Sequence, residues 1–305
     1  MSTSASSEEL NASLICYTAR PQGLASVLYY ACEQDFQGSW ELLIVDAFCE
    51  ERKELVEEFC HAWNPCVKVT HVPPLKPKNR NYHSWDIPLY LNTAWSYARG
   101  RVLVHVEDYM CFKSDWLRTH VRFVEHHPNF VSIGDVLREP IFSEHDQYHH
   151  HRKPTHEMLK DWQGTTKIME RFYNPKDYGC VNAEHYGYWL TGNMGVSLDT
   201  LLRASHAFSG APEIPTHYPE SIVAPMLFMY GVSMWPLEGA PAWHVAHPKH
   251  QIAGKIMRVE GEFCMYDEVD QQDFLDIDPK APVVKRDLIK QRKELGRWVP
   301  SNLCE

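Results

Sequence analysis

The chain has 305 residues, of which 44% are hydrophobic and 23% charged, the composition of a globular protein long enough to bury a substantial core. Its formal charge of −10 disfavours binding of nucleic acid without regard to sequence, because an acidic chain repels phosphate backbones. The nine cysteines include no CxxC pair, which favours a reducing compartment over a disulfide framework and disfavours a zinc ribbon.

The N-terminal segment is polar and lacks the apolar region of a signal peptide. No stretch approaches the roughly 20 apolar residues that span a bilayer. We therefore expect a disordered start over residues 1–12, no membrane span and a cytoplasmic location.

The first half of the sequence alternates between strand and helix patterns. Apolar runs predict strands, and apolar residues at helical spacing predict helices between them. The helix over 86–100 has a glycine at its end, which is typical of a helix C-terminus. The predicted strands are 13–18, 40–48, 66–72 and 101–106, and the predicted helices are 21–34, 50–63, 86–100 and 114–127.

This order predicts an α/β fold with a mostly parallel central sheet and helices on both faces. In open sheets of this kind, ligands bind beyond the carboxyl ends of the strands. Asp46 ends one predicted strand, and Glu107 and Asp108 follow another. The sequence therefore predicts a ligand site at this edge, where carboxylates would need a cation to face an anionic ligand.

The second half is less regular. Residues 136–190 are rich in His, Tyr and Trp and are interpreted as an insertion over the site. A strand and helix follow over 193–208, a further helix over 218–231 and a charged tail from 255 that includes a helix over 283–298. We expect one domain over 13–254 and a C-terminal helical extension over 255–305.

The order of these motifs resembles the GT-A fold of nucleotide-sugar-dependent glycosyltransferases, in particular the inverting group called family 2. The resemblance covers about residues 13–250 and implies a Rossmann-like nucleotide-binding half followed by an acceptor half. It rests on "CYTARPQGL", "ELLIVDAF", "NTAWSYARG", "VEDYM", "TGNMGVSLDTLL" and "YPESIVAPMLFMYG", followed by a histidine.

Two of these motifs depart from the family pattern. Glu107 and Tyr109 occupy the two positions of the family's Asp-x-Asp metal motif, and tyrosine is a poor ligand for a divalent ion. The family's Glu-Asp pair is replaced by Pro219 and Glu220. If metal binding is retained, Asp108 must supply the carboxylate.

The resemblance implies a transfer that needs a divalent ion, a base and a nucleotide pocket. Asp108 would bind Mn²⁺ or Mg²⁺ with either His244 or His247, and the ion would act as a Lewis acid on the leaving diphosphate. Glu220 would be the general base at the acceptor hydroxyl. The expected nucleotide-sugar contacts are Thr18, Ala19, Arg20, Asp46, Arg80 and Glu107.

The predicted function is therefore metal-assisted, inverting transfer of a sugar by single displacement. The expected partners are a nucleotide diphosphate sugar, with a UDP-sugar favoured, and a glycan or other hydroxyl acceptor. Two alternatives stay open: a sugar nucleotidyltransferase, and a non-catalytic carbohydrate-binding or scaffold protein with a degenerate fold. The single glycine of "TARPQGLAS" argues against the nucleotidyltransferase, whereas Tyr109 keeps the scaffold alternative open.

Overall fold

The structure of the protein is a computed structural model. Among the described residues, no helix is long and apolar enough to cross a membrane. The described residues are 9–19, 24–75, 87–134, 136–138, 192–207, 211–212, 227, 230–237, 239–244, 251–252, 255–256, 285–286 and 288–303.

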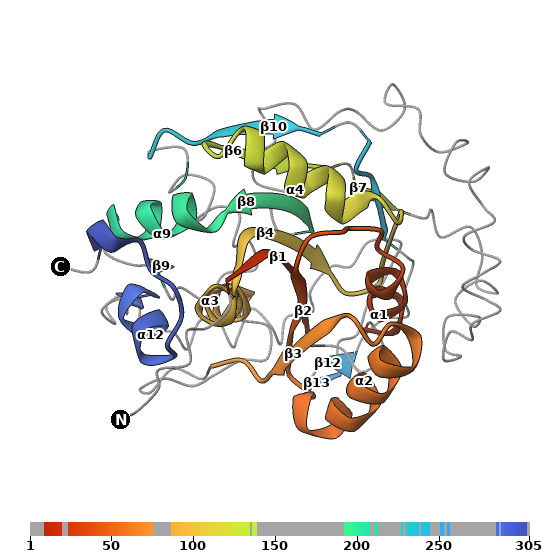
Figure 1. The fold of residues 1–305 in the computed structure, drawn as a ribbon. Coiled ribbons are helices and arrows are strands. Elements are labelled where there is room, and N and C mark those ends of the chain that lie inside the picture. The colour runs from red at the N-terminus through yellow and green to blue at the C-terminus, as the bar shows by residue number, and fades with distance from the viewer. Residues whose placement is uncertain are drawn as a thin grey trace, which may run out of the picture.

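A seven-stranded sheet forms the centre of the described fold, in the order β10-β6-β8-β4-β1-β2-β3 (Figure 1). Strand β8 pairs antiparallel with both of its neighbours, whereas the other pairs are parallel. The strands are β1 (Leu10–Thr18), β2 (Trp40–Asp46), β3 (Lys68–Val72), β4 (Gly100–Glu107), β6 (Phe130–Ile133), β8 (Asn193–Ser197) and β10 (Ser233–Pro236). The predicted mostly parallel sheet is thus confirmed.

Shorter strands form three further sheets. One has the order β5-β11-β7, and the others are the pairs β12-β13 and β14-β9. Their bounds are β5 (Met110–Phe112), β7 (Val136–Arg138), β9 (Ala211–Pro212), β11 (Ala242–His244), β12 (Gln251–Ile252), β13 (Lys255–Ile256) and β14 (Lys285–Arg286).

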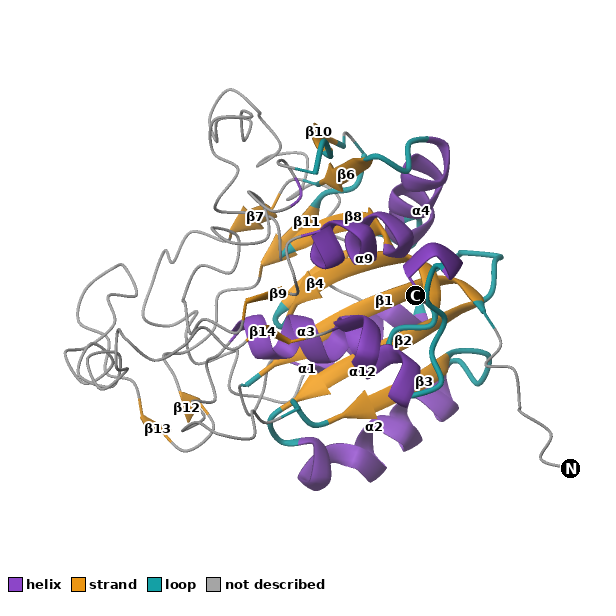
Figure 2. Cartoon of the chain, turned by 90° about the vertical axis from the view of Figure 1, so that its left-hand side faces the viewer, coloured by secondary structure: helices purple, strands orange, loops and turns teal. Residues whose placement is uncertain are grey.

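Helices cover both faces of the central sheet, as Figure 2 shows for the face that carries α3, α9 and α12. Helices α1, α2 and α4 pack on the other face. The bounds are α1 (Leu24–Cys32), α2 (Cys49–Trp63), α3 (Ile87–Tyr97), α4 (Trp116–His126), α9 (Leu198–Ala207) and α12 (Leu288–Glu294), and a 3₁₀ helix spans Ser301–Leu303.

The inner strands are largely apolar because both of their faces are covered. All seven residues of β2 are buried. Alternate residues contribute to different cores: Leu42 and Ile44 pack with α1, α2 and α4, whereas Leu43 and Val45 pack with α3, α9 and α12. This period of two also sets the face toward which each side chain at the strand ends points.

Gly100 has a different role from the predicted one. Helix α3 ends at Tyr97, and Gly100 is the first residue of β4, opposite Leu10 of β1. A Cβ atom at Gly100 would lie 2.1 Å from backbone atoms of Ala12 and Ser13. The glycine is therefore explained by the close approach of β1, and its assignment to a helix C-terminus was wrong.

Two histidines lie fully buried beside the central strands. The indole Nε1 of Trp95 donates a hydrogen bond to Nε2 of His105 over 3.3 Å, and burial lowers the pKa of His105 to about 3. His120 lies between Ser132 and Asn193, with its ring nitrogens 2.8 and 2.9 Å from their oxygens. Burial lowers the pKa of His120 to about 4, against the opposing effect of its hydrogen bond to Asn193. Both imidazoles are therefore neutral at pH 7.

We expect the free energy of unfolding to fall as the pH drops from about 6.5 toward 3. In that range the unfolded chain binds protons that buried His105 excludes, so acid favours unfolding. Between pH 7 and pH 4, the free energy of unfolding of the His105→Gln variant should fall by about 3 kcal/mol less than that of the unsubstituted chain. Urea unfolding at the two pH values measures the difference. The control His61→Gln changes an exposed histidine on α2 and should keep the original pH dependence. An unchanged pH dependence in His105→Gln would contradict the expectation.

Candidate functional site

Three neighbouring parallel strands end side by side in the described fold. Tyr17 of β1 lies opposite Glu107 of β4, and Thr18 of β1 lies opposite Asp46 of β2. Asp46 is the last residue of β2 and Glu107 the last of β4, as their position after apolar runs predicted. The structure therefore brings these polar residues together at the carboxyl edge of the sheet.

Asp108 lies just beyond β4 and is only 3% exposed. The hydroxyl of Thr18, which is also buried, donates a hydrogen bond of 2.8 Å to Oδ2 of Asp108. A short bond from a buried hydroxyl to a carboxylate fixes the orientation of the acid. The two residues are 90 positions apart in sequence and are brought together only by the pairing of β1 with β4.

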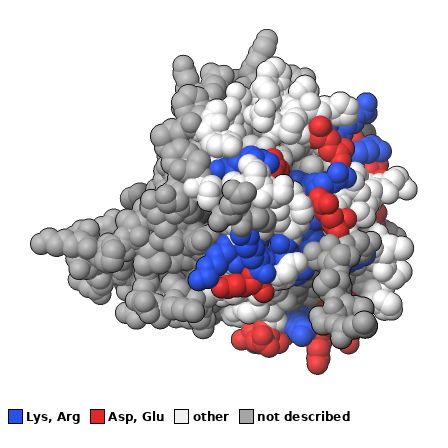
Figure 3. Space-filling model, turned by 60° about the vertical axis from the view of Figure 1, so that its left-hand side comes forward, with Lys and Arg blue, Asp and Glu red and all other residues white. Residues whose placement is uncertain are grey.

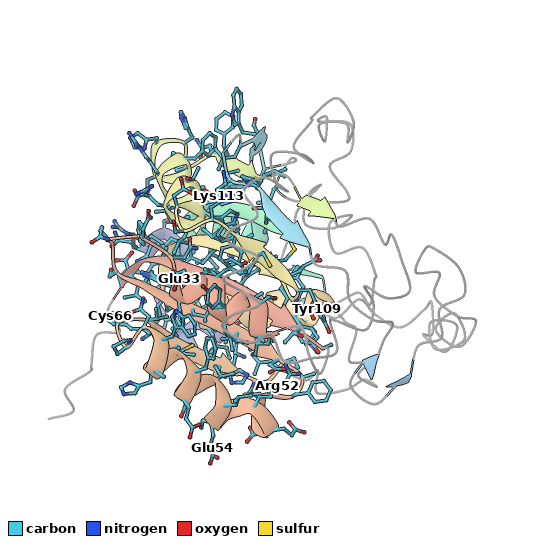
Figure 4. The ribbon with its side chains drawn as sticks, turned by 90° about the vertical axis from the view of Figure 1, so that its right-hand side faces the viewer. Glu33, Arg52, Glu54, Cys66, Tyr109 and Lys113 are labelled. Atoms are coloured by element: carbon cyan, nitrogen blue, oxygen red, sulfur yellow. The ribbon has the colours of Figure 1, made fainter. Side chains whose placement is uncertain are left out.

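Tyr109 lies between β4 and β5 in the left-handed backbone region, with φ of 59°. A residue with a Cβ atom costs about 1–2 kcal/mol in that conformation. The side chain is 9% exposed and belongs to the core on the α1 face. Figure 4 shows Tyr109 and Arg52 toward one end of the sheet, and Glu33 and Cys66 toward the other. Backbone strain of this kind is concentrated at functional sites.

The carboxylate of Asp46 is fully buried and held by its own chain. Its Oδ1 accepts a hydrogen bond of 2.8 Å from the backbone N–H of Phe48 and lies 3.4 Å from the Arg52 guanidinium on α2. Its Oδ2 lies 3.1 Å from Nε2 of His71 on β3. Asp46 therefore fixes the imidazole of His71 at the same edge of the sheet.

His71 is a site residue that the sequence analysis missed. Its side chain is 2% exposed, and within the described ranges its buried Nδ1 has no hydrogen-bond partner. A signal was available, because His71 stands near the carboxyl end of the third parallel strand, as Asp46 does on the second. The contact of His71 with Asp46 uses Nε2, so Nδ1 is the ring nitrogen that remains unpaired among the described residues.

The thiol of Cys16 shows how closely the acids are grouped. Cys16 is fully buried on β1, and its pKa is raised well above the usual value, first by burial and then by Asp108, Asp46 and Glu107. Arg52 acts in the opposite direction. All three carboxylates are thus within electrostatic reach of one sulfur atom, which stays protonated at neutral pH.

Glu107 contacts the other side of the site. The hydroxyl of Tyr17 donates to its Oε1 over 3.3 Å, and the Tyr17 ring lies 6.5 Å from that of Tyr90 on α3. Because side chains alternate along a strand, Glu107 points toward the α3 face while Thr18 and Asp46 point toward the α1 and α2 face. The acids therefore border the strand ends from both faces.

The β5-β11-β7 sheet brings later parts of the chain to the same edge. In this sheet, the backbone of His244 lies opposite Met110, two residues after Asp108, and opposite Arg138 of β7. In the central sheet, Asn193 of β8 lies opposite Val106. Strand β7 precedes residues 139–191 and strand β8 follows them. Both strands are thus paired beside the strand ends.

Several predicted site residues lie outside the described residues: Arg20, Arg80, Glu220 and His247. Ala19 is described and packs in part against the core on the α3 face, next to Thr18. Within the described part of the chain, no three His, Cys, Asp or Glu side chains are grouped closely enough to hold a metal ion. The site therefore offers Asp108 as a fixed carboxylate and His244 on a neighbouring strand.

The sequence matches no family model, and it matches no curated protein. Solved structures do match, among them a mannosyltransferase from Pyrobaculum calidifontis in complex with GDP-Man and Mn²⁺, with 12% identity over 78% of this chain and 57% of that one and a TM-score of 0.47. S. aureus TarS 1-349 in complex with UDP matches with 14% identity, 78% and 61% coverage and a TM-score of 0.48.

GalNAc-T7 with UDP, GalNAc and Mn²⁺ matches with 10% identity over 79% of this chain and 44% of that one, with a TM-score of 0.47. The chain spans about three fifths of the length of the mannosyltransferase and of the TarS 1-349 structures. At such identities and TM-scores, the function has to be argued from the site itself.

Proposed function

We propose that the chain is a cytoplasmic, metal-assisted inverting glycosyltransferase. It would move a sugar from a nucleotide diphosphate donor, with a UDP-sugar favoured, to a hydroxyl of a glycan or other acceptor. The solved structures similar to this chain include proteins in complex with GDP-Man, UDP and UDP-GlcNAc. The proposal places the donor at the carboxyl edge of β1, β2 and β4.

One observation carries the proposal: polar and acidic side chains converge where three parallel strands end. Buried Asp108 is oriented by Thr18, buried Asp46 is held beside His71, and Glu107 borders the opposite face. An edge of this kind is where open parallel sheets bind nucleotides. Because these carboxylates are negatively charged and little exposed, they favour a ligand that brings a bound cation over an uncharged ligand.

The available donor atoms suit a hard divalent ion. Carboxylate oxygens bind Mg²⁺ and Mn²⁺ well, and imidazole is an acceptable ligand for Mn²⁺. Asp108 would supply the carboxylate, and His244 or His247 the imidazole. When bound, the ion would neutralise charge on the departing diphosphate. The register of β11 supports the histidine assignment, because it brings His244 to the strand that follows Asp108.

The remaining roles follow the chemistry of single displacement. The acceptor oxygen attacks the anomeric carbon, the bond from that carbon to the diphosphate breaks, and Glu220 takes the hydroxyl proton. Thr18, Ala19, Arg20, Asp46, Arg80 and Glu107 would bind and orient the donor. The acceptor would lie between the 136–190 insertion and the helix over 218–231.

A second candidate is a carbohydrate-binding protein without transferase activity. Two observations favour it: Tyr109 stands where the metal motif has a second acid, and both oxygens of Asp46 already have partners within the chain. Such a protein would bind a glycan without a nucleotide. The two candidates therefore differ in whether a nucleotide binds and whether it needs a metal.

The deciding experiment is a calorimetric titration of UDP into the full chain, with Mn²⁺ and after its removal by EDTA. We expect binding in the presence of Mn²⁺ and at least a tenfold weaker affinity after removal, since the acids then repel the diphosphate. A screen of nucleotide sugars for donor hydrolysis would then identify the sugar. If neither UDP nor GDP binds with metal present, the transferase proposal fails and the carbohydrate-binding alternative stands.

A further inference from the structure

The opposite edge of the central sheet carries a cluster of arginines. Glu41 lies near the start of β2, Arg99 precedes β4, and Arg292 and Arg297 belong to the C-terminal segment that contains α12. In a chain of formal charge −10, Lys and Arg side chains gather in patches on the side that carries α9 and α12 (Figure 3). This edge lies at the start of the strands and is therefore separate from the candidate site at their ends.

The acid in this cluster is already fully paired. Glu41 is buried, and its Oε1 accepts hydrogen bonds from the Ser13 hydroxyl and the Arg99 backbone N–H, both over 2.7 Å. Its Oε2 accepts from the Thr70 hydroxyl and from the Arg99 guanidinium, whose Nε and Nη2 lie 2.9 and 2.8 Å away. The oxygens of Glu41 are therefore all used within the chain, and its charge is paired with Arg99 and acts more weakly on Arg292 and Arg297.

The second arginine, Arg292, donates hydrogen bonds to backbone carbonyls. Arg292 is fully buried, and its guanidinium donates to the carbonyl oxygens of Trp95, Ala98 and Trp298. Carbonyls satisfy the donors but do not cancel the charge. Burial lowers the pKa of Arg292 to about 10, with Arg297 acting in the same direction and Glu41 in the opposite one.

The third arginine is set in place by the end of α12. Gly296 has φ of +65°, and the next N–H, from Arg297, bonds to the carbonyl of Arg292 over 2.8 Å. This is the Schellman arrangement, in which a left-handed glycine turns the chain back over the helix end. It holds Arg297 within electrostatic reach of both Arg99 and Arg292.

Among the described residues, Arg297 has no side-chain hydrogen-bond partner of the kind that Arg99 and Arg292 have. Its Nε is buried, and in the part of the chain that the structure describes it has no hydrogen-bond partner. Burial and the charge of Arg99 lower its pKa, while Glu41 and Tyr97 act in the opposite direction. An unpaired buried donor and neighbouring like charges both disfavour the folded chain, unless an anion binds there.

We propose that Arg99 and Arg297 form a binding site for a phosphate-class anion at the amino edge of the central sheet. Arg99, whose side chain is 24% exposed, and half-buried Arg297 can both reach solvent, whereas Arg292 is fully buried and adds its charge nearby. The Nε and Nη2 atoms of Arg99 face Glu41, so the site would use the unpaired Nε of Arg297 together with Nη1 of Arg99, and guanidinium donors match the oxygens of a phosphate group. The group can belong to a free phosphate compound or to a lipid headgroup.

The test uses the full chain and two arginine variants of the same edge. The melting temperature is measured in sodium phosphate and in sodium chloride of equal ionic strength. Phosphate should raise the Tm of the unsubstituted chain by several degrees, because a ligand that binds only the folded state stabilises it. The Arg297→Gln variant should lose this increase. Arg101→Gln, which changes a 60% exposed arginine beside Glu9, should keep it.

Two further measurements make the outcome decisive. Titration of inorganic phosphate into the unsubstituted chain by calorimetry does not depend on the folding of any variant. Cosedimentation with phosphatidylcholine vesicles, with and without phosphatidic acid, tests the headgroup source. Binding of inorganic phosphate assigns a free phosphate compound, and binding to the acidic vesicles alone assigns the headgroup. Absence of both, or an equal Tm increase in Arg297→Gln, overturns the proposal.

Discussion

Replacing Asp108 with asparagine is expected to reduce metal-dependent donor turnover at least 100-fold. Asparagine keeps the shape of the side chain and an oxygen that can accept the hydrogen bond from Thr18, so the fold should survive. What it removes is the negative charge that the proposal assigns to metal binding. Loss of a charged ligand weakens both the binding of the ion and the stabilisation of charge on the leaving group. The measurement is donor hydrolysis with added Mn²⁺, with Mn²⁺ affinity by calorimetry as a second readout.

The matched control is Asp115→Asn, because Asp115 precedes α4 and makes no side-chain cap to that helix. Its side chain is 41% exposed, and its loss should leave turnover and Mn²⁺ affinity unchanged. A second variant, Thr18→Val, keeps the charge of Asp108 but removes the hydroxyl that orients it, so an intermediate loss is expected. If Asp108→Asn turns over the donor with undiminished metal dependence, Asp108 is not the ligand.

Gly100→Ala is expected to destabilise the fold by more than about 4 kcal/mol, enough to leave little folded chain. The added methyl would lie 2.1 Å from the backbone of Ala12 and Ser13, where no side chain can move aside. Relief requires β1 to separate from β4, and those two strands also position Thr18 and Asp108. Urea unfolding, or the yield of soluble folded chain, measures the effect.

Gly239→Ala separates this steric effect from a general intolerance of glycine replacement. Gly239 has φ of +88°, but no atom of the described residues outside its chain neighbours lies within 4 Å of the position of an added Cβ. Only the backbone strain remains, which costs about 1 kcal/mol. Equal losses of stability in the two variants would show that the contact of Gly100 with β1 is not what makes the glycine necessary.

Local sequence patterns predicted most of the first half of the fold. The alternation from β1 to α4 follows from runs of buried apolar residues and from helical spacing, and both signals are strong over 7 to 15 residues. The shortest strands, such as β5 and β7 with three residues each, carry too few residues to show a period. The reversed direction of β8 depends on the path of the chain, which no local pattern records.

The strand-end positions of the candidate-site residues could be predicted from the sequence, whereas their contacts could not. Asp46 and Glu107 could be placed because each ends a buried strand. The bond from Thr18 to Asp108 and the contact of His71 with Asp46 result from strand pairing and register. Gly100 shows the same limit, since the nearness of β1 is a tertiary property and the residue was therefore assigned to a helix end.

The attachment of β7 and β8 beside the strand ends has an evolutionary consequence. Arg138 pairs with His244, and Asn193 pairs with Val106, so the intervening chain begins and ends at fixed points on the same rim. In evolution, the segment between β7 and β8 could be replaced by one of different length or composition while the strand pairing stayed the same. If the chain is the transferase proposed above, replacement of this one segment could change its acceptor preference without a change to the central sheet.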